Sequence, residues 1–185
     1  MRCGVDVAPV RSAPADDAEQ VTQALRGEPL RVERRVDGWA FVVTAYAYSG
    51  WVRNDVLEEG VGELPQPSVG SVLDQARRYL GAPYLWGGMT DLGIDCSGLV
   101  HMAHRHLGRL VPRDAWQQEE AGVLVEALEP GDVIVYGDPG RRADHVAFWV
   151  GEGRILHATG RDSLGVVEEL EPRELAARRR SIVRL

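Results

Sequence analysis

Hydrophobic and polar residues alternate with a period of two along about the first third of the chain. The clearest runs are Leu30–Val36 and Trp39–Thr44, which flank Asp37-Gly38, a dipeptide typical of tight hairpin turns. Similar short runs predict further strands at residues 5–10, 19–25 and 48–53. Strands this short and this closely spaced predict a small β-barrel over residues 1–60.

A proline-containing joint separates this region from one with a helical period. Residues 61–68 form a linker by composition. After the linker, apolar residues recur at helical spacing, with Ser68 or Ser71 available as the N-cap and Gly81 as the stop. The change of period across the joint predicts a domain boundary, with the second domain at residues 69–185.

The second domain combines helices and strands. A Gly-rich turn leads into an apolar helix that would start at Ser97 and stop at Gly108, and a second short helix is possible near residue 117. Strands are expected at residues 132–136, 145–150, 154–159 and 166–168, followed by a helical tail at 174–180 and an edge strand at 181–183. This mixture predicts an α+β fold.

One cysteine stands where the Gly-rich turn meets the apolar helix. A helix starting at Ser97 would bring the sulfur of Cys96 beside backbone N–H groups that have no partner within the helix. The partial positive charge at that end favours an anion, so we expect a lowered pKa for the Cys96 thiol and a nucleophile near neutral pH. The alternative interpretation is a buried, inert cysteine.

Two histidines lie in a predicted hairpin downstream of Cys96. A turn centred on Glu152 would place Ala147 opposite His157. His145 and His157 would then project from the same face as diagonal neighbours, close enough for two imidazoles to meet. If the Cys96 helix packs across that face, His145 can act as the general base and His157 can orient it. For either histidine alone, a structural hydrogen bond is the alternative.

These motifs resemble the NlpC/p60 family of papain-like cysteine peptidases of bacterial peptidoglycan. The matching phrases are LGAPYLWGG (80–88), DCSGLV (95–100), PGDV (130–133), DHVA (144–147) and ILHA (155–158). The resemblance covers the chain from about residue 68 onward and implies that Cys96 is the nucleophile, His145 the general base and His157 the orienting residue. It also implies that the Tyr84 hydroxyl, with the Cys96 backbone N–H, stabilises the oxyanion.

Phrases in the first domain resemble a bacterial SH3-like (SH3b) module, which commonly accompanies cell-wall enzymes. They are QALRGE (23–28), GWAFV (38–42) and YSGWV (48–52). The implied fold is α+β, with an N-terminal SH3-like β-barrel followed by a papain-like domain whose catalytic helix packs on an antiparallel sheet. Trp39, Trp51, Tyr46 and Tyr48 could form a ligand-stacking surface, although we favour the barrel core for the two tryptophans.

The two modules together look like a narrower group, the γ-D-glutamyl-L-diamino-acid endopeptidases, which includes dipeptidyl-peptidase VI. The phrase PRDA (112–115) and Gln117 add to this resemblance. In that group the SH3b module closes one end of the cleft and requires a free N-terminal L-alanine on the substrate. The resemblance implies that Asp95 and Ser97 hold the ammonium and backbone of that alanine.

Four further residues complete the predicted substrate-binding set. Glu19 and Tyr48 are the candidates from the SH3b module, by position alone, because an ammonium needs a carboxylate partner and hydrogen-bond acceptors. Trp86 belongs to the same Tyr-x-Trp-Gly-Gly phrase as Tyr84. Arg113 could pair with the α-carboxylate of D-Glu, and a structural salt bridge is an equally good interpretation.

Charge and composition limit the classes of partner that we expect for this protein. The 185 residues include 21 Lys+Arg and 28 Asp+Glu, for a net charge of -7, and the one basic run is Arg178-Arg179-Arg180. We interpret that run as a solvated helix end and expect no nucleic-acid partner. No apolar run is long enough for a membrane span or a signal peptide, which favours a cytoplasmic location. An exported protein whose signal had been removed would look the same.

Cysteine and histidine usage predicts neither a disulfide framework nor a bound metal. Cys3 and Cys96 are the two cysteines, and a bond between them would silence the predicted nucleophile. His101, His104 and His106 are spread around the predicted helix instead of sharing a face, so we expect no metal site and no cofactor.

The sequence therefore predicts a cysteine peptidase that cuts the γ-D-glutamyl–diamino-acid bond of free murein peptides. Three alternatives stay open at this point: an exported hydrolase of the intact wall, a non-catalytic wall-binding protein, and a papain-like acyltransferase or amidase, which would use the same thiol chemistry.

Overall fold

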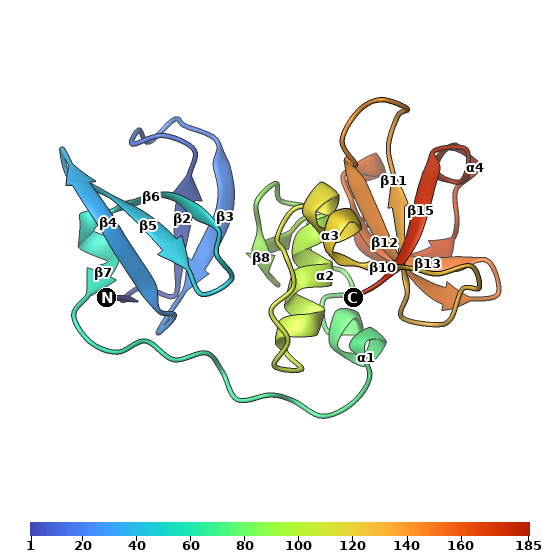
Figure 1. Ribbon diagram of the computed structural model, residues 1–185, viewed down its shortest axis with the longest axis horizontal. Coiled ribbons are helices and arrows are strands. Elements are labelled where there is room, and N and C mark those ends of the chain that lie inside the picture. The colour runs from blue at the N-terminus through green and yellow to red at the C-terminus, as the bar shows by residue number, and fades with distance from the viewer. The chain divides into compact units, whose positions relative to one another are not determined.

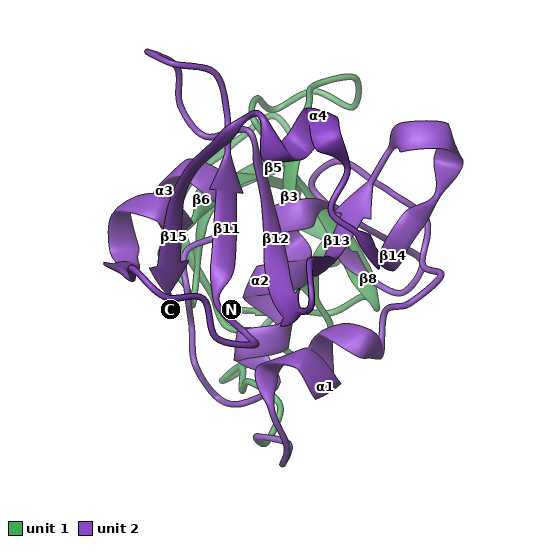
Figure 2. Cartoon of the chain, turned by 90° about the vertical axis from the view of Figure 1, so that its right-hand side faces the viewer, with its two compact units in different colours: residues 1–66 green, residues 67–185 purple.

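The structure, a computed structural model, describes residues 1–185 and divides into two compact units, residues 1–66 and 67–185 (Figures 1 and 2). Residues 61–69, around the boundary, have no regular secondary structure. Each unit has its own β-sheet and its own hydrophobic core. None of the helices combines the length and the apolar character needed to cross a bilayer.

Unit 1 is a small β domain. Five antiparallel strands form a sheet in the order β3-β2-β6-β5-β4, and β1 pairs with β7. The predicted hairpin is confirmed, because β4 and β5 pair on either side of Asp37 and Gly38, which have the positive φ angles that such a turn needs. The elements are β1 (Arg2–Cys3), β2 (Val7–Arg11), β3 (Gln20–Leu25), β4 (Leu30–Val36), β5 (Trp39–Thr44), β6 (Ser49–Arg53), η1 (Asn54–Val56) and β7 (Leu57–Glu58).

The two tryptophans of unit 1 are buried, with 4% and 7% of their surfaces exposed. Ala40 and Val52 are paired neighbours that belong to the core cluster. Side chains alternate along a strand, so Trp39 and Trp51 lie on the opposite face. There the ring of Trp51 meets that of Phe41 edge-on, with centroids 5.2 Å apart, and an arginine covers both rings. The expectation that both tryptophans are buried is confirmed, and they pack on the face opposite the cluster that contains Ala40 and Val52.

Unit 2 is an α+β domain with one large antiparallel sheet. Its elements are α1 (Val72–Arg77), β8 (Met89–Thr90), β9 (Gly93–Ile94), α2 (Cys96–Arg105), α3 (Ala115–Ala121), β10 (Val123–Leu124), β11 (Val133–Tyr136), β12 (His145–Gly151), β13 (Arg154–Thr159), η2 (Arg161–Ser163), β14 (Gly165–Leu170), α4 (Arg173–Ala176) and β15 (Arg179–Arg184). Ser71, one of the two predicted caps, starts α1 through a capping box with Asp74.

The six-stranded sheet of unit 2 has the order β10-β15-β11-β12-β13-β14. The last strand therefore lies inside the sheet, between β10 and β11, and the prediction of an edge strand at the C-terminus is wrong. The apolar residues of β15 explain its position inside the sheet, because Ile182 and Val183 pair with the fully buried Ile134 and Val133 of β11. The predicted helical tail is also shorter than expected, since α4 ends at Ala176 and β15 begins at Arg179.

Helix α2 packs on one face of this sheet, and the short helix α4 contacts the other face. Helix α2 packs against β12 and β13, where His104 stacks on Phe148 with ring centroids 5.9 Å apart. Figure 2 shows α2 behind β11 and β12. On the other face Leu175 of α4 packs on a cluster that includes Ala147 and Ile155. At the N-terminal end of α2, Cys96 meets the backbone N–H of Val146, the second residue of β12.

Candidate active site

The helix that carries Cys96 begins one residue earlier than predicted, and Asp95 caps it. The Asp95 backbone is extended, with φ −98° and ψ 176°, and its carboxylate accepts the backbone N–H of Gly98 at 2.7 Å. This is the usual way an aspartate satisfies an unpaired donor at a helix start. Cys96 is therefore the first residue of α2, where backbone N–H groups have no partner within the helix.

A buried ion pair fixes this helix start. The guanidinium of Arg113, 1% exposed, donates to both carboxylate oxygens of Asp95, at 2.9 and 2.8 Å. It also donates to Ser97 Oγ at 3.0 Å, and the N–H of Gly87 donates to Asp95 at 2.7 Å. Arg113 thus forms the structural salt bridge, one of its two predicted roles. Because protein donors occupy both Asp95 oxygens, contacts of Asp95, Ser97 and Arg113 with substrate stay predictions.

Gly98 allows two segments of backbone to meet at the helix start. A Cβ at this position would lie 2.4 Å from the carbonyl oxygen of Gly88, 3.0 Å from a carboxylate oxygen of Asp95 and 3.1 Å from the Arg113 guanidinium. The Gly88 carbonyl also accepts a hydrogen bond from Arg113 at 3.1 Å. The glycine after Cys96-Ser97 therefore has a packing reason, since any side chain would push the loop or the ion pair away.

The predicted hairpin register is confirmed. Phe148 pairs with Leu156 and Trp149 with Ile155, the spacing expected for a turn centred on Glu152, with an irregularity next to the turn. His145 and His157 are therefore diagonal neighbours on one face. His145 Nε2 and His157 Nδ1 are 2.8 Å apart, a hydrogen bond whose donor depends on the tautomers.

Helix α2 does not pack across the histidine face as predicted. Its His104 stacks on Phe148, and side chains three residues apart on a strand point to opposite faces, so His145 faces away from the body of the helix. Cys96 reaches β12 at its first residues, where the backbone N–H of Val146 is directed at the sulfur. Cys96 Sγ and the His145 ring form no direct hydrogen bond in this structure. In enzymes without substrate, such catalytic hydrogen bonds are often long, and they shorten when the substrate binds.

The prediction of a lowered pKa for Cys96 is wrong for this structure. The side chain is 5% exposed, and burial raises the pKa of its thiol to about 12, with the Asp95 carboxylate acting in the same direction. The N–H groups of Val146 and Ser97 and the Arg113 charge oppose this rise without reversing it. Desolvation therefore outweighs the helix start, and the thiol is protonated at neutral pH.

The two histidines are also held neutral. Burial lowers the pKa of His145 to about 3, and the neighbouring His157 and Arg178 act in the same direction. Burial lowers the pKa of His157 as well, although its bond to Glu169 opposes the shift. Cys96 and the two histidines are therefore neutral at rest, the states from which general-base catalysis starts, with the imidazole accepting the thiol proton as the sulfur attacks.

Tyr84 lies close enough to the helix start to interact with Cys96 electrostatically. Burial raises the pKa of Tyr84, and the negative charges of Asp95 and of an ionised Cys96 act in the same direction. Its hydroxyl therefore keeps its proton at any physiological pH and can donate a hydrogen bond. A permanent donor near the nucleophile is what the predicted oxyanion role requires, and that role stays a prediction.

Glu169 is the residue at this site that sequence reasoning missed. His157 Nε2 lies 3.0 Å from Glu169 Oε1, and Arg161 Nη2 donates to both carboxylate oxygens, at 2.6 and 2.7 Å. Glu169 pairs with Ile155 across β13 and β14, so it is the diagonal neighbour of His157 on the same face. Extending the predicted strand at 166–168 by one residue, with this register, would have found it.

The remaining predicted contacts lie on both units. Glu19 and Tyr48 are residues of unit 1, where the Tyr48 ring lies 6.3 Å from that of Tyr46. Trp86 is in unit 2, in the loop before β8, and is 57% exposed. Their contacts with substrate stay predictions.

The other histidines of α2 are bonded within the protein. His101 Nδ1 lies 2.7 Å from the Val111 carbonyl oxygen, and His104 Nδ1 lies 2.9 Å from that of Val100. His106, just after the helix, meets the Tyr79 hydroxyl at 2.9 Å. These histidines therefore serve the packing of the helix, and Cys3 and Cys96 are both free, buried thiols.

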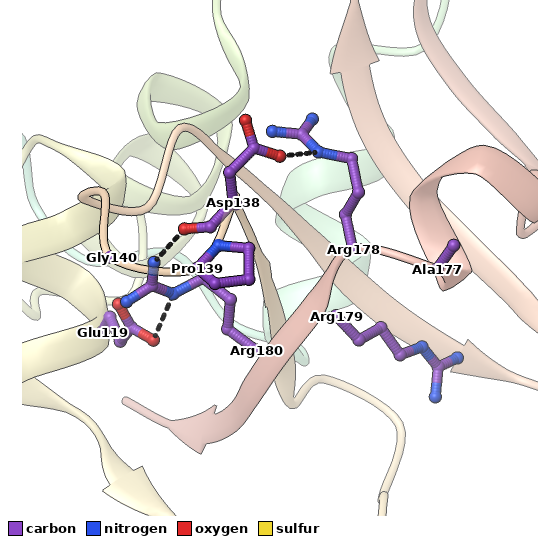
Figure 3. A pocket seen from close by; sticks show the side chains of 9 residues that line it. Glu119, Asp138, Pro139, Gly140, Ala177, Arg178, Arg179 and Arg180 are labelled. Carbon is purple, nitrogen blue, oxygen red and sulfur yellow. Dashed lines mark hydrogen bonds and ion pairs between the residues drawn. The ribbon is translucent and has the colours of Figure 1, made fainter.

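A pocket of about 420 Å³ lies in unit 2 where the β11–β12 loop meets the start of β15. Figure 3 shows its lining, in which Arg178 donates to Asp138 at 3.1 Å and Arg180 to Glu119 at 3.2 Å. Arg179 points away from these two pairs and bonds to Glu171. Because each guanidinium already has a carboxylate partner, we assign no anion to this pocket.

Both units of the chain match known protein families. Residues 81–178 match the model of the NlpC/P60 family, and residues 10–57 match that of the bacterial dipeptidyl-peptidase Sh3 domain. The first match covers more than half of the chain, so the chain belongs to the NlpC/P60 family.

Two curated relatives are named gamma-D-glutamyl-L-lysine dipeptidyl-peptidase. The one from Bacillus cereus is 34% identical over 114 residues, 58% of this chain and 34% of that protein. The one from Bacillus subtilis is 38% identical over 110 residues, 55% of this chain and 37% of that protein. The match thus spans about a third of the length of these relatives. The solved peptidoglycan hydrolase RipB from Mycobacterium tuberculosis is 32% identical, with a TM-score of 0.53, over 61% of this chain and 62% of that one.

Proposed function

We propose that this protein is a cysteine peptidase that hydrolyses the γ-D-glutamyl–diamino-acid bond of murein peptides with a free N-terminal L-alanine. The observation that carries the proposal is the hydrogen-bonded pair of His145 and His157 on the strands that meet the Cys96 end of α2. The names of the two Bacillus relatives and the match to a dipeptidyl-peptidase Sh3 domain support the substrate class.

In the proposed reaction, Cys96 Sγ attacks the γ-carbonyl carbon of D-Glu while its proton passes to His145. The Tyr84 hydroxyl and the Cys96 backbone N–H stabilise the tetrahedral oxyanion. His145 then gives the proton to the leaving amine of the diamino acid, and an acyl-enzyme remains on Cys96. Water, deprotonated by His145, attacks the thioester and releases L-Ala-γ-D-Glu.

Mass spectrometry of the products tests this proposal. The substrate is L-Ala-γ-D-Glu-diaminopimelate, offered with its amino terminus free or acetylated, to the full chain and to its Cys96→Ala variant. We expect L-Ala-γ-D-Glu and diaminopimelate from the free peptide and the unaltered protein alone. Equal cleavage of the acetylated peptide would overturn the requirement for a free alanine, and an intact free peptide would overturn the peptidase itself.

A wall hydrolase is the second candidate, favoured by the likeness to RipB. Incubation with intact sacculi separates the two, because release of muropeptides from sacculi with no cleavage of the free tripeptide would favour wall hydrolysis. A role in the recycling of free murein peptides predicts a cytoplasmic location, which cell fractionation tests. A non-catalytic wall-binding role predicts binding to sacculi with no product from either substrate.

A further inference from the structure

Four side chains form a continuous hydrogen-bonded chain that leads from β12 to the end of β14. His145 Nε2 bonds to His157 Nδ1, His157 Nε2 bonds to Glu169, and Arg161 holds both oxygens of Glu169. The register places His145, His157 and Glu169 diagonally across three adjacent strands on one face. We call this set the histidine–carboxylate chain.

Each link of this chain decides which atom of the next one carries a proton. An ionised carboxylate accepts hydrogen bonds and cannot donate them, so His157 must carry its proton on Nε2. A neutral imidazole has one N–H, which leaves His157 Nδ1 as an acceptor. His145 must then donate from Nε2, and its Nδ1 keeps the lone pair.

The surroundings favour the ionisation states that this reasoning needs. Burial opposes ionisation of Glu169, yet the hydrogen bonds from Arg161 and His157 leave its pKa lowered, so the carboxylate is charged at neutral pH. His157 is fully buried, and its pKa is lowered, chiefly by that burial, so it is neutral. A charged acceptor beside a buried neutral ring is a strong bias on the tautomer, because such bonds exceed neutral ones in strength.

We propose that Glu169 is a positioning residue, which locks both imidazoles in the Nε2–H tautomer and so reserves His145 Nδ1 as the atom that accepts the Cys96 proton. The step moves one proton from Cys96 Sγ to His145 Nδ1 as the sulfur bonds to the γ-carbonyl carbon, and it leaves a tetrahedral oxyanion and an imidazolium. The hydrogen bond from His145 Nε2–H to His157 is kept throughout, and the negative charge of Glu169 stays at the far end of the histidine–carboxylate chain. This inference rests on the proposed function for the identity of the nucleophile.

Nitrogen NMR of the histidine side chains tests the inference on the full-length protein at pH 7. The variants are Glu169→Ala, which removes the acceptor, and Glu169→Gln, which keeps an acceptor oxygen and removes the charge. The matched control is Glu168→Ala, since Glu168 precedes Glu169 in β14, faces the other way and pairs with Arg77 and Arg154. His157→Gln and His145→Gln variants assign the two rings.

We expect Nε2–H tautomers for both rings in the unaltered protein and in the Glu168→Ala control. In Glu169→Ala the Nε2–H population of His157 and His145 should fall, with a decrease in kcat of about 10- to 100-fold and little change in KM. The Glu169→Gln variant should lie between the unaltered protein and Glu169→Ala in both the Nε2–H population and kcat. An Nδ1–H proton on His145 in the unaltered protein would overturn the inference, even if a variant failed to fold.

The tautomers also separate this inference from the proposed function. If the unaltered protein cleaves no peptide but shows both Nε2–H tautomers that depend on Glu169, the peptidase proposal fails and the assignment of Glu169 holds. If the protein cleaves the peptide and Glu169→Ala leaves both tautomers unchanged, the assignment of Glu169 fails and the peptidase proposal holds.

Discussion

Two pairs of an arginine with a carboxylate stand at opposite ends of the candidate site, and they differ in depth. Arg113 and Asp95 have side chains 1% and 7% exposed, whereas Arg161 and Glu169 are 37% and 24% exposed. The buried pair holds backbone, since Asp95 also takes the N–H groups of Gly87 and Gly98. The outer pair holds a side chain, since Glu169 takes only the ring of His157 from the site.

The difference shows that one chemical pair can serve two purposes. A buried pair is costly to break, because removing one partner leaves an uncompensated charge, so it suits a part that must not move. A half-exposed pair contributes little to stability, because solvent screens it, yet it can still orient a neighbouring group. Cys96 is thus placed by the buried pair, and its proposed base is oriented by the outer one.

Breaking the buried pair should have the largest effect. Arg113→Ala leaves the Asp95 carboxylate without its guanidinium at the start of α2, and we expect a loss of about 3–5 kcal/mol in the free energy of unfolding. Urea unfolding measures it. Arg77→Ala, which removes an exposed partner of Glu168, is the control and should cost less than about 1 kcal/mol. Equal losses in the two variants would contradict the comparison.

Crowding the buried pair without removing it should chiefly reduce activity. A Cβ on Gly98 would meet the Gly88 carbonyl oxygen at 2.4 Å, so Gly98→Ala must shift the loop or the first turn of α2. A shift of about 1 Å at the nucleophile can cost roughly 100-fold in rate, and we expect a loss of that size in kcat/KM. Gly160→Ala is the control, because its Cβ would sit in ordinary contact, 3.6 Å from the Tyr84 ring. Full activity of Gly98→Ala would refute this account of the glycine.

Loosening the outer pair should have a smaller effect. Arg161→Ala removes the donor that holds both Glu169 oxygens, and we expect a stability change within about 1 kcal/mol. The kcat should fall less than in Glu169→Ala, because the carboxylate itself remains to accept from His157. Paired kinetic and unfolding measurements on both variants check this order. A larger loss of stability than in Arg113→Ala would reverse the comparison.

Lowering the pH should leave the proposed base unaffected over a wide range. With the pKa of His145 lowered to about 3, the ring takes up a proton only below about pH 4, so its base form persists as the pH falls from 7 to 5. We expect kcat/KM to stay flat over that interval and to fall only at lower pH. A decline through pH 6.5, the ordinary range of histidine, would show that the base is more exposed to solvent than the structure has it.

Sequence reasoning located the chemistry better than its environment. The register of β12 and β13 could be predicted, because a turn at Glu152 fixes which residues face each other, and His145 and His157 followed from it. The start of α2 could also be predicted to within one residue. Neither the hairpin register nor the helix start tells how deeply a side chain is buried. The sequence therefore predicted a lowered pKa for Cys96, whereas desolvation raises it.

Other features depended on pairings between distant segments. Glu169 becomes a neighbour of His157 only through the pairing of β13 with β14, and the strand predicted there ended one residue short of it. The place of β15 between β10 and β11 likewise depends on long-range pairing that no local period reveals. The burial of Trp39 could be predicted from its size, but its packing on the face of β5 opposite the cluster that contains Ala40 depends on how the strands pair.

The central claim is that Cys96 rests as a neutral thiol and gives up its proton only as it attacks. Titrating the ultraviolet absorbance of the thiolate tests it, with the Cys96→Ser variant subtracted to remove the signals of Cys3 and the tyrosines. A thiol pKa of about 12 predicts no Cys96 thiolate at pH 7 and absorbance still rising above pH 9. One equivalent of thiolate at pH 6, absent from Cys96→Ser, would mean a preformed ion pair with His145 and would contradict the account.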